Sequence, residues 1–266
     1  MKKITVVGGD NRLKIVKEKL EAGGYAVDTL GLYPEESGDI KSSQIVVLPV
    51  PTTKDGLNVF TPLSHRKIPL SYISENTASH QLILSCNYLF EGRQCVDYGS
   101  LDSYALLNSV PTAEGAIKLA IENTPYTLWK SSVLVIGYGR VGKLLADRLK
   151  AFGCNVTVSA RKPADFAMLE ALGFSYINTE QLSSVPLNYQ IIFNTVDVEV
   201  IANEALEKCS SDLIIDLSTK GGLSLKFAEE CGIKALKAPG LPGLIAPKTA
   251  AEILCNTLTY IINSYN

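Results

Sequence analysis

The stretch that decides the fold lies at residues 133–142 and reads VLVIGYGRVG. Its first four residues are apolar, as in a buried strand, and an amphipathic helical pattern follows the glycines over residues 141–152. The spacing G-x-G-x-x-G, placed after a strand and at the start of a helix, is the fingerprint of a dinucleotide-binding βαβ unit. We therefore predict an α/β protein with a parallel sheet around this turn.

The predicted turn offers main-chain N–H groups to a pyrophosphate. Gly137 permits the tight turn, Gly139 lets the phosphates approach the main chain, and Gly142 allows close packing of the helix on the strand. The positive end of the helix faces the same ligand. The predicted cofactor-binding residues of the turn are Gly137, Tyr138, Gly139, Arg140, Val141 and Gly142. The alternative is a tight strand-to-helix turn without a ligand.

The next strand indicates which dinucleotide binds. An NAD site is expected to carry Asp or Glu about 20 residues beyond the glycines, whereas residues 156–162 read VTVSARK. Ser159, Arg161 and Lys162 suit a 2′-phosphate, so we predict NADP rather than NAD. The alternative is that Arg161 and Lys162 form a solvated turn. Thr195, which follows the apolar run 191–194, is predicted to lie beneath the nicotinamide ribose.

A second strand–turn–helix pattern begins at Ile4 and predicts a second parallel sheet. Its turn at residues 8–10 lacks the third glycine, so a second dinucleotide site is not expected. Arg12, one turn into the helix, is either an anion contact or a surface cation. Further strands are predicted at 25–30, 45–50, 81–84, 105–107, 133–136, 155–159, 191–194 and 213–217, and further helices at 113–122, 141–152, 166–172 and 248–264.

These elements predict two domains and a terminal helix. Residues 1–122 form an N-terminal, flavodoxin-like substrate domain, and residues 123–246 form the NADP-binding domain. Residues 247–266 form a C-terminal helix that we expect to return to the first domain. In open α/β sheets ligands bind beyond the carboxyl ends of the strands, which makes hydroxyl-rich and glycine-rich segments after strands candidates for a small-carboxylate site. These segments are 49–53, 76–80, 108–115, 217–222 and 239–248.

The composition excludes several classes of partner. The chain has 266 residues and a formal net charge of −2, from 25 Lys and Arg against 27 Asp and Glu. No strong basic field exists to bind nucleic acid or anionic lipid, and no apolar run approaches the roughly 20 residues that span a bilayer. We expect a cytosolic protein. Six scattered cysteines and two histidines predict reduced thiols and no metal site.

Several stretches resemble the family of dipicolinate synthase A subunits, from spore-forming bacteria, over the whole length of the chain. Besides the glycine fingerprint they are GGDNR at 8–12, LPV at 48–50, TASH at 77–80, NSVPTAEG at 108–115, SAR at 159–161 and APGLPGLIAPKTA at 238–250. The resemblance implies two Rossmann-like domains arranged as in 2-hydroxyacid and alanine dehydrogenases. It also implies the formation of dipicolinic acid from dihydrodipicolinate or its hydrated precursor, with NADP as hydride acceptor. The implied setting is a complex with a flavoprotein-like B subunit, in the mother cell during sporulation.

Such a substrate has two carboxylates that the protein must hold. We assign this role to Thr52, Thr53, Ser109, Thr112 and Lys220, and expect the domain cleft to exclude water. Residues 218–222 read STKGG, where the family pattern has Arg-Pro before paired glycines, so Lys220 replaces an arginine. His80 is the predicted catalytic residue that takes the ring proton; the alternative is a helix-end or surface histidine.

Two other functions remain open. One is an NADP-dependent dehydrogenase of another small keto or amino diacid. The other is a non-catalytic protein that senses nucleotides, which would bind the cofactor without turning over any diacid. We expect an oligomer in each case.

Overall fold

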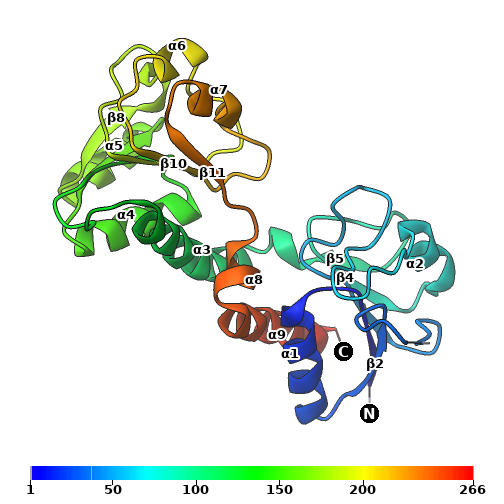
Figure 1. Cartoon of the computed structure of the whole chain (residues 1–266). Helices are drawn as coiled ribbons and strands as arrows, with labels where there is room; N and C mark the ends of the chain where they lie inside the picture. Colours follow the sequence, from blue (N-terminus) through cyan, green and yellow to red (C-terminus); the bar gives the residue numbers. More distant parts are fainter. Residues whose placement is uncertain (1, 37, 266) are drawn as a thin grey trace. The chain divides into compact units, whose positions relative to one another are not determined.

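The computed structural model describes residues 2–36 and 38–265. The chain forms two compact units, residues 1–108 with 242–266 and residues 109–241, both drawn in Figure 1. Each unit is built on a parallel sheet, which confirms the predicted fold class. The units divide inside helix α3 (Asp102–Asn123), whereas the sequence predicted a boundary at the end of that helix.

The first unit contains a five-stranded sheet with the order β2-β1-β3-β4-β5. All neighbouring strands pair in parallel, with Ile4 aligned with both Val27 and Ile45. The carboxyl ends of the strands therefore share one edge of the sheet. The strands are β1 (Lys3–Val7), β2 (Ala26–Leu30), β3 (Ile45–Val47), β4 (Leu82–Ser85) and β5 (Cys95–Asp97).

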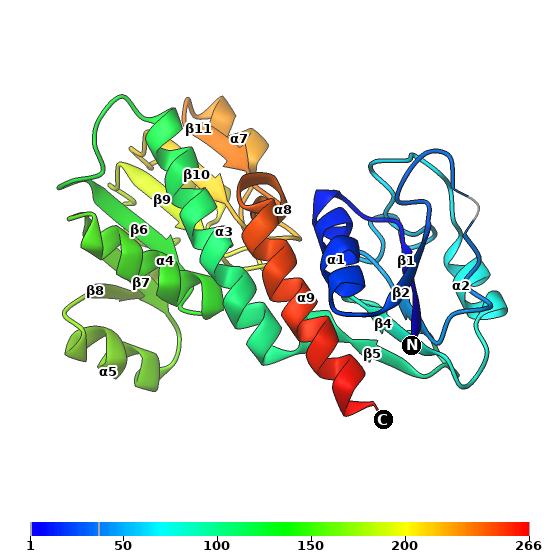
Figure 2. The same ribbon diagram turned by 90° about the horizontal axis from the view of Figure 1, so that it is seen from below.

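Helices and a loop cover the two faces of this sheet. The helices are α1 (Asn11–Ala22), α2 (Leu70–Asn76) and α9 (Pro247–Ser264), and a 3-10 turn at Tyr98–Ser100 follows β5. α1 and α9 pack against each other (Figure 2) and share a core with Ile4 and Val6. Val7, on the opposite face of β1, packs in the core that includes α2. The C-terminal helix thus belongs to the first unit.

Leu258 tests whether α9 supports this core. Its side chain is fully buried in the cluster with α1, so Leu258→Ala is expected to lower the free energy of unfolding by about 2–5 kcal/mol. Tyr260 on the same helix is 72% exposed, and Tyr260→Ala is expected to change stability by no more than about 0.5 kcal/mol. Chemical denaturation measures both. Equal effects would show that α9 does not support the core.

The second unit contains a six-stranded parallel sheet with the order β11-β10-β9-β6-β7-β8. The chain builds outward from β6 in one direction and then returns to β9 to build in the other, so the strand order reverses between β6 and β9. Helix α4 packs on β6 and β7. The elements are β6 (Ser132–Ile136), α4 (Arg140–Ala151), β7 (Asn155–Ala160), α5 (Pro163–Ala171), β8 (Ser175–Asn178), a 3-10 turn (Thr179–Gln181), β9 (Ile191–Asn194), α6 (Asn203–Leu206), β10 (Leu213–Asp216), α7 (Leu225–Glu230), β11 (Lys234–Lys237) and α8 (Leu241–Ile245).

Helix α3 corrects two predictions. Residues 105–107 were expected to form an edge strand, and a helix was expected to begin near Ala113. The structure has one continuous helix from Asp102, with Pro111 inside it. Tyr104, Ala113 and other buried residues recur at helical spacing along it, and this burial outweighs the cost of an internal proline.

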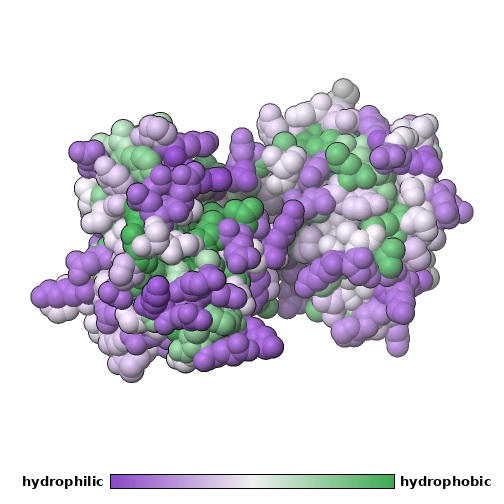
Figure 3. All heavy atoms as spheres, turned by 90° about the horizontal axis from the view of Figure 1, so that it is seen from above, coloured by the Kyte–Doolittle hydropathy of each residue, from purple (hydrophilic) through white to green (hydrophobic). Residues whose placement is uncertain are grey.

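The surface is mixed in character. Hydrophilic residues cover much of the face drawn in Figure 3, with hydrophobic residues gathered in patches between them. Within residues 2–36 and 38–265, no helix is both long and apolar enough to cross a membrane. All six cysteines are present as free thiols.

Candidate functional site

The turn after β6 excludes side chains at two of its glycines. Gly137 has a φ of +96°, and a Cβ there would lie 2.7 Å from the hydroxyl of Thr195. A Cβ on Gly142 would lie 2.0 Å from the carbonyl oxygen of Gly137. Both positions therefore require glycine, and the turn brings the start of α4 close to the end of β6.

Gly139 borders open space instead. No heavy atom lies within 4 Å of the position that its Cβ would take. It is the N-cap residue of α4, and no side-chain hydrogen bond caps the helix there. Tyr138 is half-buried, whereas Arg140 is exposed. Open space in front of a helix N-terminus fits a pyrophosphate, because the first N–H groups of a helix have no partner within it.

Thr195 joins this turn to the neighbouring strand. Its backbone N–H and its hydroxyl both donate to the carbonyl oxygen of Ile136, at 3.0 and 2.8 Å. The loops after β6 and β9 are thereby held together at the point where the strand order reverses. In open α/β sheets this switch point is where ligands bind.

Ser159 supports the turn from inside the protein. It is fully buried, and its hydroxyl oxygen accepts the N–H of Gly137 at 3.2 Å and the hydroxyl of Thr179 at 3.1 Å. The structure thus gives Ser159 a supporting role in place of the predicted contact with a 2′-phosphate. The physical reason is that the end of β7 is buried on both faces, since Val158, Ser159 and Ala160 are all buried.

Arg161 and Lys162 are exposed just beyond the carboxyl end of β7. Arg161 lines a hollow of about 520 Å³. The opposite wall of this hollow comes from the segments that follow β8 and β9. The other lining residues are Thr179, Glu180, Ser183, Val198, Glu199, Val200, Ile201 and Ala202. The hollow therefore contains one guanidinium and two carboxylates.

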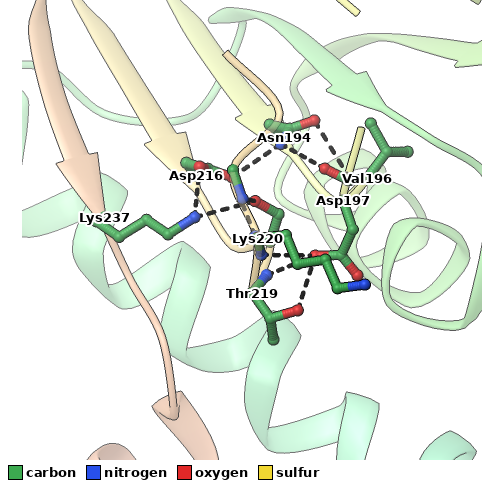
Figure 4. Close-up of polar contacts among 9 residues, drawn as sticks. Asn194, Val196, Asp197, Asp216, Thr219, Lys220 and Lys237 are labelled. Carbon is green, nitrogen blue, oxygen red and sulfur yellow. Dashed lines mark hydrogen bonds and ion pairs between the residues drawn. The ribbon is translucent and has the colours of Figure 1, made fainter. Parts of the chain in front are cut away.

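A buried network fixes the loops after β9 and β10 (Figure 4). Asp216, at the end of β10, accepts hydrogen bonds from Asn194 Nδ2 at 2.8 Å and Lys237 Nζ at 2.7 Å. The same Asp216 oxygen that binds Asn194 also accepts the N–H of Ser218 at 3.0 Å. Burial acts to raise the pKa of Asp216, but the hydrogen bonds from Lys237, Ser218 and Asn194 outweigh it, and the pKa lies below the usual value.

Asp197 fixes the segment that carries Lys220. One of its carboxylate oxygens accepts the backbone N–H groups of Thr219 and Lys220 at 2.6 and 3.2 Å, and the hydroxyl of Thr219 at 2.9 Å. Burial raises the pKa of Asp197, but these hydrogen bonds prevail and lower it. Lys220 is exposed and lies beyond the carboxyl end of β10, at the same edge of the sheet as Gly137.

In the first unit, Thr52 and Thr53 follow β3, as predicted. Thr52 is fully buried, and its hydroxyl accepts the N–H of Cys86 at 2.8 Å. The hydroxyl of Thr53 donates to Asp55 at 3.0 Å. Both hydroxyls therefore hold loops together at the carboxyl edge of the sheet. Each already has a hydrogen-bond partner within the protein.

His80 lies at the opposite edge of the same sheet, which corrects the prediction that places it in the substrate site. It precedes β4, and it lines a hollow with Lys2, Gln44 and Gln94. These residues precede the parallel strands β1, β3 and β5, so the hollow lies at the amino ends. The error came from taking residues 76–80 as following a strand, when they follow helix α2.

Three cations near Thr53 were not predicted from the sequence as site residues. Lys54, Arg66 and Lys67 line a hollow of about 300 Å³, and no ion pair with a carboxylate is found for them among the described residues. Asp55 also lines this hollow, and hydrogen bonds from Asn58 and Leu57 hold its pKa below the usual value. Lys54 is separated by 12 residues from the adjacent pair Arg66 and Lys67, so no local motif indicated that the three cations line one hollow.

The two remaining predicted substrate residues lie on α3. Ser109 is buried and Thr112 is half-buried, one helical turn further on. The predicted substrate set thus divides between the units, with Thr52 and Thr53 in the first and the α3 residues and Lys220 in the second. Within the described part of the chain, no group of three or more His, Cys, Asp or Glu residues could hold a metal ion.

The parallel sheet, the glycine turn at its switch point and the open helix N-terminus define the second unit as a nicotinamide-coenzyme domain of the dehydrogenase type. Residues 112–210 match the family described as D-isomer specific 2-hydroxyacid dehydrogenase, NAD binding domain. Residues 3–87 match the family of N-terminal domains of the dipicolinate synthase A subunit. The dipicolinate synthase A subunit of Bacillus subtilis is 36% identical over 283 aligned residues, which cover 98% of this chain and 95% of the relative. The chain belongs to the family of dipicolinate synthase A subunits.

Solved structures agree with this assignment. The A subunit from Bacillus halodurans superposes with a TM-score of 0.88 at 29% identity, covering 98% of this chain and 97% of that one. The dipicolinate synthase structure from Bacillus subtilis gives 0.83 at 32% identity, covering 99% and 96%. D-Lactate dehydrogenase from Salmonella gives 0.67 at 14% identity, covering 97% and 95%, and it shows a shared fold only.

Proposed function

We propose that this protein is an NADP-dependent oxidoreductase that forms dipicolinic acid from dihydrodipicolinate or its hydrated precursor. The observation that supports this most strongly is the combination of family membership with a complete glycine turn at the switch point of the second sheet. The relatives carry the name dipicolinate synthase, and the turn supplies a place for the coenzyme. We further propose that the chain works with a B subunit, because the relatives are named as A subunits. The mother cell of a sporulating bacterium is the setting that the family resemblance implies for this activity.

The residues of the turn fit a dinucleotide. The space in front of Gly139 and the uncapped start of α4 would hold the pyrophosphate, and Thr195 would lie under the nicotinamide ribose. When bound, NADP accepts a hydride from the substrate. In the proposed reaction one C–H bond of the dihydropyridine gives its electron pair to the coenzyme as hydride, and a second ring hydrogen leaves as a proton. The product ring is aromatic, so the protein mainly has to position the substrate.

Three residues of the second unit remain candidates for holding the substrate. Lys220 offers a charge at the carboxyl edge of the sheet, on a loop that Asp197 fixes. Ser109 and Thr112 are hydroxyl residues one helical turn apart on α3. A lysine forms charge-assisted hydrogen bonds with carboxylates. The hydroxyls of Thr52 and Thr53 hold loops of the first unit, and substrate binding by these two residues stays a prediction.

In this proposal, Arg161 determines whether the protein prefers NADP or NAD. The hollow that it lines also contains Glu180 and Glu199, which would repel a 2′-phosphate but accept hydrogen bonds from ribose hydroxyls. If the phosphate meets Arg161, Arg161→Ala should weaken NADP binding by roughly tenfold to a hundredfold and leave NAD binding within about twofold. Calorimetric titration measures both affinities. Lys150→Ala, an exposed cation on α4, is the control, and equal losses for both coenzymes would contradict the NADP preference.

The reaction itself is tested by supplying the condensation product of aspartate semialdehyde and pyruvate. The full chain receives NADP or NAD, with and without the B subunit, and the absorbance of dipicolinate and of the reduced coenzyme is followed. We expect both absorbances to rise together. Coenzyme binding without turnover of this or any other diacid, even with the B subunit present, would favour a non-catalytic nucleotide sensor. Turnover of another keto or amino diacid alone would favour a different dehydrogenase.

A further inference from the structure

Three sequence stretches that the proposed cofactor site does not use meet at one side chain in the first unit. Arg12 belongs to residues 8–12, Val50 to residues 48–50 and Gly243 to residues 238–250. The Nη2 atom of Arg12 donates to the carbonyl oxygen of Val50 at 2.7 Å. A Cβ on Gly243 would lie 2.9 Å from Arg12 Nε and 3.0 Å from its Cζ. Helix α8 therefore rests directly against the guanidinium, and only glycine permits this approach.

Arg12 is a buried charge, with 5% of its surface exposed, which excludes the surface-cation alternative. Asp10 binds it through two atoms, with Nε donating to Oδ1 at 3.0 Å and Nη2 donating to Oδ2 at 2.8 Å. Burial lowers the pKa of Arg12, but the hydrogen bond and charge of Asp10 more than compensate. The guanidinium is thus fixed in one orientation before any ligand arrives.

One edge of the guanidinium is not used by the protein. Within residues 2–36 and 38–265, Nε and Nη2 have acceptors, whereas Nη1 has none. Nη1 is also not among the fully buried polar atoms that lack a partner, so part of it is exposed to solvent. A buried arginine normally satisfies its donors within the protein, and a donor pair that stays open at the carboxyl edge of a parallel sheet lies where ligands bind.

The groups around Arg12 add little negative charge. Burial raises the pKa of Cys86 to about 12, and it raises the pKa of Tyr98 and Tyr104 as well. All three are neutral near pH 7, so Asp10 is the carboxylate that directly balances Arg12. An anion that approaches Nη1 therefore meets an open guanidinium edge whose charge is balanced by one paired carboxylate.

We propose that Arg12 binds one of the two carboxylates of the substrate through Nη1, held in place by Asp10, Val50 and the glycine of α8. This inference rests on the proposed function, because it takes a ring dicarboxylate as the substrate. Asp10 is then a positioning residue, and Gly243 provides the space that the bound orientation of Arg12 needs.

Binding of pyridine-2,6-dicarboxylate and of pyridine-2-carboxylate to the full chain, with NADP present, tests the proposal. The wild-type protein is expected to prefer the dicarboxylate. Arg12→Lys should weaken dicarboxylate binding by roughly tenfold to a hundredfold and change the affinities for the monocarboxylate and NADP by less than about threefold. Lys17→Met on the same helix, which removes only an ion pair with Glu21 near the surface, should leave all three affinities unchanged.

Gly243→Ala provides a second variant in which Arg12 is retained. Its Cβ displaces the guanidinium, so the same selective loss for the dicarboxylate is expected. If Arg12→Lys and Gly243→Ala both keep the wild-type preference for the dicarboxylate, or lose both pyridine ligands equally, Arg12 does not bind a carboxylate. If the wild-type protein shows no preference for the dicarboxylate, the result contradicts the proposed function and therefore also this inference.

Discussion

Gly139→Ala is expected to weaken NADP binding by roughly tenfold to a hundredfold while leaving the fold intact. The added methyl group would project into open space, where no protein atom lies within 4 Å, so the folded chain accommodates it without strain. The same space is where the proposed pyrophosphate approaches the N-terminus of α4. Thermal unfolding and calorimetric titration with NADP measure the two properties on the same sample.

Two other glycines give matched comparisons for this variant. Gly142→Ala puts a Cβ at 2.0 Å from the Gly137 oxygen, so the turn must open, and we expect losses of both stability and NADP binding. Gly23→Ala, where the nearest atom lies at an ordinary 3.4 Å, should affect neither. If Gly139→Ala binds NADP as tightly as the wild type, the phosphates do not lie against this turn, and the cofactor site is wrong.

The sequence indicated the central elements of both sheets because they carry their signals locally. β6, α4 and β7 were predicted to within a residue or two, since buried strands are continuously apolar and the glycines have fixed spacing. β5, β8 and β11 were not predicted. All three lie at sheet edges, where a strand is partly exposed and lacks a continuous apolar run.

The candidate site was harder to predict from the sequence than the central strands were. Whether a residue lies at the carboxyl or the amino edge of a sheet depends on which element precedes it, and a short helix before β4 was not recognised. His80 was therefore placed at the wrong edge. Lys237 was missed because β11 was missed, and the contact between Arg12 and Gly243 spans 231 residues of chain. Such contacts depend on tertiary packing, which local patterns do not contain.

Asp216→Ala is expected to lower the free energy of unfolding by about 3–5 kcal/mol, because it removes the buried partner of Lys237 and Asn194. Asp216 is fully buried, whereas the side chain of Lys237 is 33% exposed, so the lower end of this range is expected. The same substitution releases the loops that carry Thr195 and Lys220. Turnover with NADP should therefore fall as well, and chemical denaturation with steady-state kinetics checks the two effects.

An exposed ion pair of nearly the same length is the control. Lys3 and Asp28 lie 2.8 Å apart with 36% and 45% of their side chains exposed, so Asp28→Ala should cost no more than about 1 kcal/mol. The pH dependence gives an independent check on Asp216. Its folded pKa lies below the usual value, so its contribution to stability is complete above the unfolded aspartate pKa of about 3.9 and is lost as the pH falls through the lower folded value. Asp216→Asn should flatten this acid loss of stability, and an unchanged acid profile would mean that the carboxylate does not stabilise the fold through its charge.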